Sequence, residues 1–162
     1  MARPFEAPLL RDCRDMLVEL QRAGAEFLID GGFAVAAHGH RRATEEIDIL
    51  VRPTRENAAL VHAAIGRFGA PYQGLVVDDL AAPGVIFRIG SGRGDSIDIT
   101  TTIDGVLFDE ARDGMIDVEL DGLRLPFIGR EPLLKNKRAA GRPRDLDDVA
   151  ALERLPPRGG PR

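Results

Sequence analysis

Two apolar segments of the sequence carry acidic residues at positions where a buried β-strand is expected. In residues 46–51 (EIDILV), Glu46 and Asp48 are two residues apart. Because successive side chains of a strand point to opposite faces, both carboxylates project from one face and the aliphatic side chains from the other. Asp98 is flanked by isoleucines in a second segment of this kind. The chain is therefore expected to form a sheet with three carboxylates on one face.

These acids have two interpretations. Acidic residues on a solvated sheet face can simply keep an edge strand soluble. Both segments are otherwise rich in isoleucine, which indicates central strands, and like charges on one face destabilise a sheet. A divalent cation would remove the repulsion, and Mg²⁺ prefers oxygen ligands of this kind with a substrate phosphate completing its shell. A metal site is the favoured interpretation.

A glycine pair and several basic residues accompany the acids. Gly31-Gly32 indicates a turn that needs a positive φ, and bare N–H groups at a helix start can approach a phosphate. Arg42 and Thr44 directly precede the acids, and the planar guanidinium of Arg42 suits phosphate oxygens. Lys137 belongs to a second basic group, which either reaches a phosphate or complements nearby acids, namely Asp145, Asp147 and Asp148.

The apolar periodicity predicts helices and strands over most of the chain. Helices are expected at residues 9–20, 33–38, 54–68, 105–112, 131–140 and 144–155, and strands at residues 26–29, 46–51, 84–89, 96–101, 115–120 and 123–128. Asp121-Gly122 indicates a tight hairpin between the last two strands. The expected fold class is α+β, or α/β, with a mixed sheet flanked by helices. Residues 1–155 are expected to form a single domain and residues 156–162 a disordered tail.

Composition and charge exclude several classes of protein. The 162-residue chain has a net charge of −4 and a pI near 5.4, whereas broad nucleic-acid binding needs a basic face. Cys13 is the only cysteine, which rules out an intrachain disulfide and a cysteine-based zinc site. The amino terminus lacks the apolar core of a signal peptide, and the longest uncharged stretches are too short to span a bilayer. A cytoplasmic protein without a membrane partner is expected.

Residues 90–94 (GSGRG) imitate a glycine-rich nucleotide-binding loop. They lie between two expected strands rather than between a strand and a helix, so the dinucleotide-binding fingerprint is not met. We expect a flexible hairpin loop there. The sequence also contains no P-loop motif.

Taken together, the motifs resemble the nucleotidyltransferase superfamily that shares the polymerase-beta core. The resemblance rests on a series of short motifs, namely Gly31-Gly32, His38-Gly39, Arg42-x-Thr44, Glu46-x-Asp48 and the later Asp98. The closing stretch from Asn136 to Asp148 is similar to small bacterial members related to abortive-infection toxins. The similarity runs from about Phe27 to Leu155 and implies a nucleotidyltransferase-like core with short C-terminal helices.

The resemblance implies transfer of a nucleoside monophosphate from a nucleoside triphosphate, such as ATP, to a hydroxyl acceptor, which could be a small molecule, a protein or an RNA. Two Mg²⁺ ions would be held by the expected catalytic residues Glu46, Asp48 and Asp98. Asp98 would also accept the proton of the acceptor. The protein would act by positioning and charge neutralisation. Nucleotide binding is expected at Gly31, Gly32, Arg42, Thr44 and Lys137.

Two departures from the family pattern leave an alternative open. Glu46 stands where the family usually has aspartate. Its longer side chain would change the arrangement of ligand atoms around a metal, and Mg²⁺ requires near-octahedral ligation. The helical segment after the last strand is also shorter than in many relatives, so a large acceptor, a homodimer or a partner protein would complete the site. The alternative is a weak or inactive nucleotidyltransferase-fold binding module, for example one half of a toxin–antitoxin pair.

Overall fold

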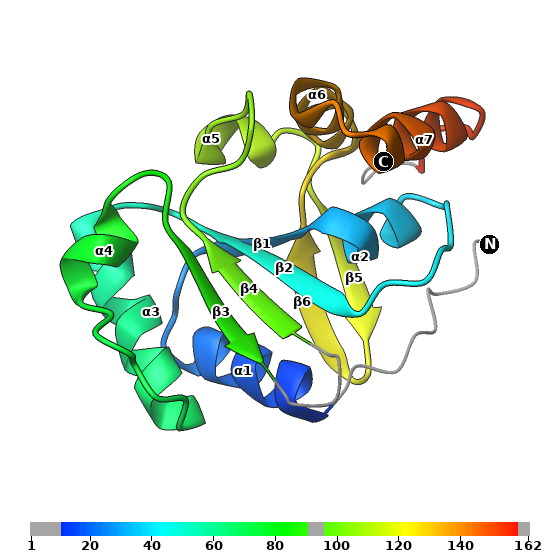
Figure 1. Cartoon of the computed structure of the whole chain (residues 1–162). Coiled ribbons are helices and arrows are strands. Elements are labelled where there is room, and N and C mark those ends of the chain that lie inside the picture. Colours follow the sequence, from blue (N-terminus) through cyan, green and yellow to red (C-terminus); the bar gives the residue numbers. More distant parts are fainter. Residues whose placement is uncertain (1–10, 91–95, 159–162) are drawn as a thin grey trace.

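The computed structural model of the chain describes residues 11–90 and 96–158. Within these residues, six strands form one sheet in the order β3-β4-β2-β1-β6-β5 (Figure 1). The strands are β1 (Phe27–Asp30), β2 (Glu46–Val51), β3 (Ile86–Gly90), β4 (Ser96–Thr100), β5 (Ile116–Leu120) and β6 (Leu123–Phe127). The helices are α1 (Arg11–Arg22), α2 (Gly31–Ala37), α3 (Arg55–Phe68), α4 (Val77–Ala81), α5 (Phe108–Ala111), α6 (Arg130–Ala140) and α7 (Pro143–Glu153).

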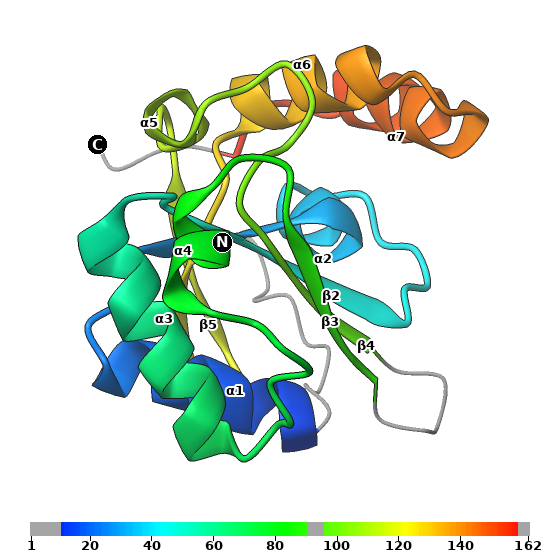
Figure 2. The same cartoon turned by 60° about the vertical axis from the view of Figure 1, so that its left-hand side comes forward.

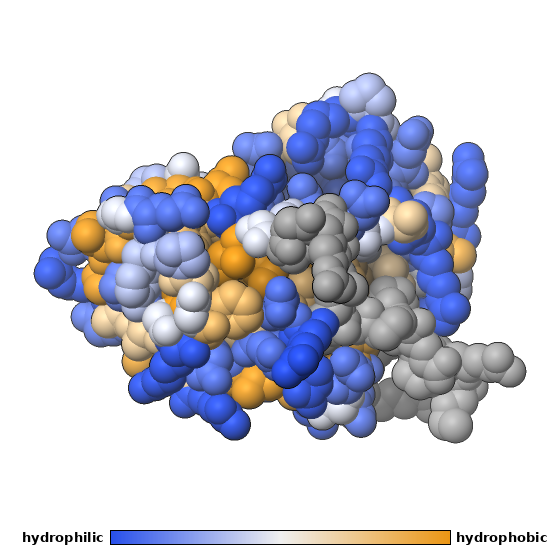
Figure 3. All heavy atoms as spheres, turned by 60° about the horizontal axis from the view of Figure 1, so that its bottom comes forward, coloured by the Kyte–Doolittle hydropathy of each residue, from blue (hydrophilic) through white to orange (hydrophobic). Residues whose placement is uncertain are grey.

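Helices cover both faces of the sheet (Figures 1 and 2). α1 and α4 each pack against α3 on one side, and α2, α6 and α7 lie on the other. α1 is amphipathic, and the residues of its apolar stripe are buried: Cys13, Met16, Leu17 and Leu20. Seen from below, the surface carries many hydrophilic side chains with apolar areas between them (Figure 3). Each helix thus buries one face against the sheet or a neighbouring helix.

The two acidic strands lie side by side in the centre of the sheet. β2 and β4 pair in parallel, with Asp48 opposite Asp98 and Ile47 opposite Ile97. Ile47 and Ile97 are buried in the core, so the acids must face the other side. The parallel pairs β2–β4 and β1–β6 are combined with antiparallel pairs. The predicted mixed sheet, with the acids on central strands, is confirmed.

Local signals place several boundaries as predicted. The side chain of Thr54 accepts a hydrogen bond from the backbone N–H of Asn57 and caps α3. The β5–β6 hairpin turns at Asp121 and Gly122, with φ values of 50° and 76°. Positive φ at both central residues is what a type I′ turn requires. In both places the chemistry of a few neighbouring residues determines the boundary, which is the start of α3 in the first case and the turn between β5 and β6 in the second.

Other segments differ from the prediction or lie outside the described residues. α2 begins at Gly31 itself rather than at residue 33, and α4 was not predicted because its five residues show no helical periodicity. Of the predicted hairpin loop, residues 91–95 are not described, and neither are residues 9 and 10 of the first predicted helix. Residues 156–158 of the predicted tail have no regular structure, and 159–162 lie outside the description. Among the described residues, no helix is long and apolar enough to cross a bilayer.

Candidate active site

The three predicted carboxylates meet at one point of the sheet. Glu46, Asp48 and Asp98 each place an oxygen so that all three atoms lie within 4.8 Å of one another. The parallel register of β2 and β4 brings Asp48 and Asp98 together, and Glu46 precedes Asp48 by two positions on the same face. We call these three residues the acidic trio. Its convergence is the geometric condition for holding a divalent cation.

A cleft of about 610 Å³ lies beside the acidic trio. It is bounded by the β1–α2 junction, by strands β2, β3 and β4, and by the helices α6 and α7. All the residues predicted for nucleotide binding line this cleft together with the trio, namely Gly31, Gly32, Arg42, Thr44 and Lys137. The structure therefore brings together every site residue predicted from the sequence.

The glycine pair allows the backbone to approach the acids. Gly31 has a φ of 63°, and a Cβ atom there would lie 2.0 Å from Oδ2 of Asp48. A Cβ atom on Gly32 would lie 2.9 Å from the Oγ1 of Thr44. A side chain at either position would therefore force a neighbouring side chain to shift, and at Gly31 it would also strain the backbone. The backbone of this junction borders the cleft where a phosphate is expected.

Asp48 carries a strong electrostatic perturbation. Burial first, and then the charges of Asp30, Glu46 and Asp98, raise the pKa of Asp48 to about 7 against the opposing charge of Lys137. The pKa thus reflects the burial of this carboxyl group together with a surplus of negative charge around it. A set of hard oxygen donors with surplus negative charge fits a divalent cation such as Mg²⁺.

Asp30 is a site residue that the sequence analysis did not identify. It is buried at the end of β1, opposite Asp48 in the antiparallel β1–β2 pair. Its Oδ1 atom has no hydrogen-bond partner among the described residues, and burial raises its pKa. An acid at the end of an apolar strand, directly before Gly31-Gly32, was the available signal. Asp30 adds a fourth carboxyl group beneath the cleft.

Arg88 is the second residue that was missed. It lies on β3 directly opposite Asp98 in the antiparallel β3–β4 pair. Its Nε and Nη2 atoms each donate to an Asp98 oxygen at 2.8 Å, and Nη2 also lies 3.5 Å from Oε1 of Glu46. The pKa of Arg88 is raised, first by the hydrogen bonds to Asp98 and then by the nearby carboxylate charges. One arginine therefore already bridges two members of the acidic trio.

The opposite wall of the cleft is a chain of alternating charges. Arg42 donates to both Asp148 oxygens at 2.7 and 2.9 Å, and Lys137 lies 3.1 Å from Asp148 and 3.3 Å from Asp145. Arg142 donates to Asp145 in turn. Burial alone would raise the pKa values of Asp145 and Asp148, but hydrogen bonds and charge from these cations lower them. Lys137 and Arg142 thus do complement nearby acids while lining the cleft.

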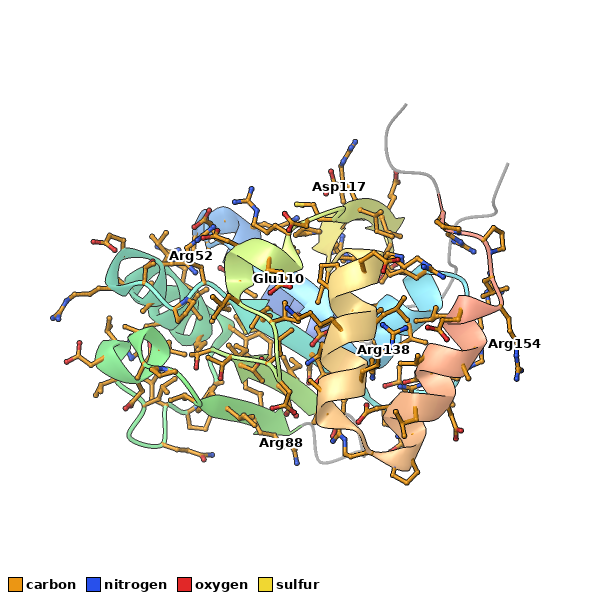
Figure 4. All side chains as sticks on the ribbon, turned by 90° about the horizontal axis from the view of Figure 1, so that it is seen from above. Arg52, Arg88, Glu110, Asp117, Arg138 and Arg154 are labelled. Carbon is orange, nitrogen blue, oxygen red and sulfur yellow. The ribbon has the colours of Figure 1, made fainter. Side chains whose placement is uncertain are left out.

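This chain of charges fixes the helical pair α6–α7 over the site. α6 and α7 lie side by side, and Arg138 of α6 pairs with Glu153 of α7 (Figure 4). Gly141, with a φ of 65°, allows the tight turn between the two helices. The turn brings Asp145 back to within reach of Lys137. The C-terminal helices therefore form the cationic wall of the cleft.

The pKa of Asp48 predicts a pH-dependent gain in stability on substitution. Because the folded pKa of about 7 exceeds the ordinary aspartate pKa of 3.8, ionised Asp48 destabilises the fold. This destabilisation is absent below pH 4, grows up to pH 7 and persists above it. Asp48→Asn should therefore raise the free energy of unfolding by about 1–3 kcal/mol at pH 8 and leave it unchanged at pH 3.5. Asp48 is only partly buried, and solvent screening keeps the gain in stability below the value that the whole pKa shift would give. Urea denaturation in the absence of metal measures this gain in the free energy of unfolding.

Two controls make this stability measurement specific. Asp117→Asn removes an exposed charge on β5 and should change the stability at pH 8 by less than about 0.5 kcal/mol. Excess Mg²⁺ should raise the melting temperature of the native chain more than that of Asp48→Asn, because the native trio has the greater negative charge. Equal stability of Asp48→Asn and the native chain at pH 8 would contradict the raised pKa.

Comparison with known proteins agrees with this architecture. No family model matches the sequence, and no curated protein matches it. Among solved structures, the chain is similar to the lincosamide antibiotic adenylyltransferase LnuA with bound lincomycin, at a TM-score of 0.57 and 14% identity over 90% of this chain and 97% of that one. It is also similar to a candidate nucleotidyltransferase from Thermotoga maritima, at a TM-score of 0.51 and 14% identity over 91% and 94% of the two chains. The chain therefore has a nucleotidyltransferase fold, as predicted.

Proposed function

We propose that this chain, with its nucleotidyltransferase fold, transfers a nucleoside monophosphate from a nucleoside triphosphate to a hydroxyl acceptor in the presence of Mg²⁺. The observation that carries the proposal is the acidic trio, whose oxygens lie within 4.8 Å of one another beside a cleft with a cationic wall. Clustered carboxylates suit a metal, and the cations opposite suit a polyphosphate. The two halves of the cleft thus match the two halves of a metal–nucleotide complex.

The reaction requires a bond exchange at the α-phosphorus. The acceptor oxygen forms a bond to this atom, the bond to the bridging oxygen breaks, and pyrophosphate leaves with the electron pair. Asp98 is the proposed acceptor of the hydroxyl proton. Glu46, Asp48 and Asp98 would hold up to two Mg²⁺ ions, which when bound neutralise the triphosphate and polarise the reacting phosphoryl group.

The remaining residues bind and orient the triphosphate in this proposal. The N–H groups at Gly31 and Gly32 would donate to phosphate oxygens, because residues without a Cβ atom let a phosphate approach the backbone closely. Arg42, Thr44 and Lys137 contribute positive charge and a hydroxyl along the same wall. Arg42 and Lys137 are already held by buried carboxylates, so their positions are fixed before a nucleotide arrives. Such preorganisation favours electrostatic stabilisation of the transferring group.

The similarity to one solved structure over nearly its whole length suggests which acceptors to test first. This chain covers 97% of LnuA, an adenylyltransferase for lincosamide antibiotics. The similarity to this small-molecule nucleotidyltransferase therefore extends over nearly all of that chain. Lincosamides and other hydroxyl-bearing antibiotics are the acceptors to screen first, followed by proteins and RNA ends. Localisation in the cytoplasm, where nucleoside triphosphates are available, is part of the proposal.

Isothermal titration with ATP, GTP, CTP and UTP, with and without Mg²⁺, tests the proposal. The native chain should bind at least one triphosphate about 10-fold more tightly with Mg²⁺ than without it, and Asp48→Asn should lose most of this difference because a metal ligand is missing. Pyrophosphate release in the presence of an acceptor then measures transfer. Absence of metal-dependent binding by both proteins would remove the enzymatic function.

A second candidate is a nucleotide-binding module without turnover, acting with a partner protein as in a toxin–antitoxin pair. Two observations favour it: Glu46 provides a longer ligand than aspartate, and Arg88 already binds both oxygens of Asp98. This candidate predicts metal-dependent nucleotide binding by the native chain with no pyrophosphate release. Transfer by Glu46→Asp alone would then identify the native protein as an enzyme that has lost activity.

A further inference from the structure

We propose that Arg88 is the resident counter-ion of the acidic trio, and that it has to leave Asp98 before Asp98 can ligate a divalent cation. This inference rests on the proposed metal-dependent function and concerns how the site is loaded. It assigns to Arg88 a positioning role that competes directly with metal binding.

The geometry places the Arg88 guanidinium where a cation would lie. It engages both oxygens of Asp98 at 2.8 Å and reaches Glu46 at 3.5 Å, so it satisfies two of the three potential ligands. A dication held by the same oxygens would lie beside this guanidinium, and like charges at such a separation repel strongly. Simultaneous occupation by Arg88 and a metal is therefore unfavourable.

Exposure shows that Arg88 is free to leave. Its side chain is 61% exposed on the edge strand β3, whereas the Asp98 side chain is 7% exposed (Figure 4). Arg42 makes the same two-pronged contact with Asp148, but there the exposed fractions are 19% and 2%. The Arg42 pair is therefore held within the fold. Arg88 can instead turn towards water without opening the core.

The acidic trio is asymmetric for the same reason. Arg88 shields Asp98 and, at longer distance, Glu46, while Asp48 makes no hydrogen bond to Arg88 among the described contacts. The Asp48 side of the trio is thus available to a cation first. Ligation by Asp98 comes second, because Asp98 must first give up its hydrogen bonds to Arg88. Removal of Arg88 should therefore tighten metal binding rather than weaken it.

Titration with Mn²⁺, followed by electron paramagnetic resonance of the free ion, tests this inference without requiring turnover. Arg88→Gln should bind Mn²⁺ about 3- to 30-fold more tightly than the native chain, because a competing positive charge is gone. Arg124→Gln is the matched control: it removes an exposed arginine that pairs with Asp117 on the β5–β6 hairpin. Its Mn²⁺ affinity should stay within about 2-fold of native at physiological salt.

The outcomes separate this inference from the proposed function. Equal or weaker Mn²⁺ binding by Arg88→Gln, with nucleotide transfer intact in the native chain, would overturn the role of Arg88 alone. Absence of Mn²⁺ binding by both proteins would overturn the proposed function as well. If Arg88→Gln does not fold, Arg88→Met removes the same charge while keeping an unbranched side chain on the edge strand. Its affinity should then exceed native, and a native-like value would contradict the inference.

Discussion

Replacement of Gly31 by alanine should lower the kcat/KM for nucleotidyl transfer by about 100-fold or more, because it displaces a proposed metal ligand. The added Cβ atom would lie 2.0 Å from Oδ2 and 2.8 Å from Cγ of Asp48, so the carboxylate has to move. Displacement by an ångström or more is enough to disturb a preorganised site. Steady-state pyrophosphate release measures the loss, and titration with Mn²⁺ should show weaker metal binding in parallel.

Gly24 provides the control for backbone strain. It has a similar φ of 70°, and a Cβ atom there would meet nothing within 4 Å. Gly24→Ala should therefore cost about 1 kcal/mol of stability, as expected for alanine in the left-handed region, and leave transfer unchanged. A comparable loss of activity in both variants would show that strain, and not the contact with Asp48, is responsible.

Substitution of Lys137 by methionine should lower the free energy of unfolding by about 2–4 kcal/mol. The variant leaves Asp145 and Asp148, both buried, without the cation that lies between them. Each keeps one arginine partner, which limits the loss. The pKa values of these carboxyl groups are lowered in the fold, so the stabilisation is present above pH 4 and lost as the pH falls through the folded pKa values.

Lys135 is the matched control on the same helix. It pairs with Glu110 at 2.6 Å, but its side chain is 56% exposed. Lys135→Met should change stability by less than about 1 kcal/mol, because exposed ion pairs contribute little. Urea denaturation of both variants at pH 7 and pH 3 measures the difference. Similar losses for Lys135→Met and Lys137→Met at pH 7 would show that the cationic wall is not a buried structural network.

The acidic trio was predictable because strand periodicity alone decides which face a side chain occupies. The spacing of Glu46 and Asp48 determines their common face, and the isoleucines beside Asp98 mark it as part of a central strand. That Asp98 shares their sheet face was expected from the same pattern in its own segment, and the parallel pairing of β2 with β4 in the structure places it beside Asp48. Periodicity contains no information on which strands are neighbours, since neighbouring strands are chosen by the packing of the whole chain.

Arg88 was missed because the expected strand ranges, 84–89 and 96–101, do not specify the register between the two strands. In the structure Gly90 pairs with Ser96, so Arg88 lies opposite Asp98. A one-residue slip moves every side chain of a strand to the other face. A difference of one residue in the register of β3 therefore decides whether Arg88 faces the acidic trio.

Lys137 illustrates a different limit of the sequence. Its helix and the acids that follow were both predicted, and the sequence left open whether the lysine serves a phosphate or a carboxylate. The turn at Gly141 resolves the geometry, because it folds α7 back against α6 and places Asp145 and Asp148 beside the ammonium group. Such contacts depend on the angle between two helices, which periodicity does not specify.

The contact between Arg42 and Asp148 joins residues that are 106 positions apart. During synthesis on the ribosome, the strands that bear the acids emerge well before α7. A nascent chain that has not yet released α7 would present Arg42 and Lys137 without their carboxylate partners. The finished cleft therefore arises only after α7 has emerged, and a product cut before Pro143 would keep its proposed metal ligands while lacking a completed binding wall.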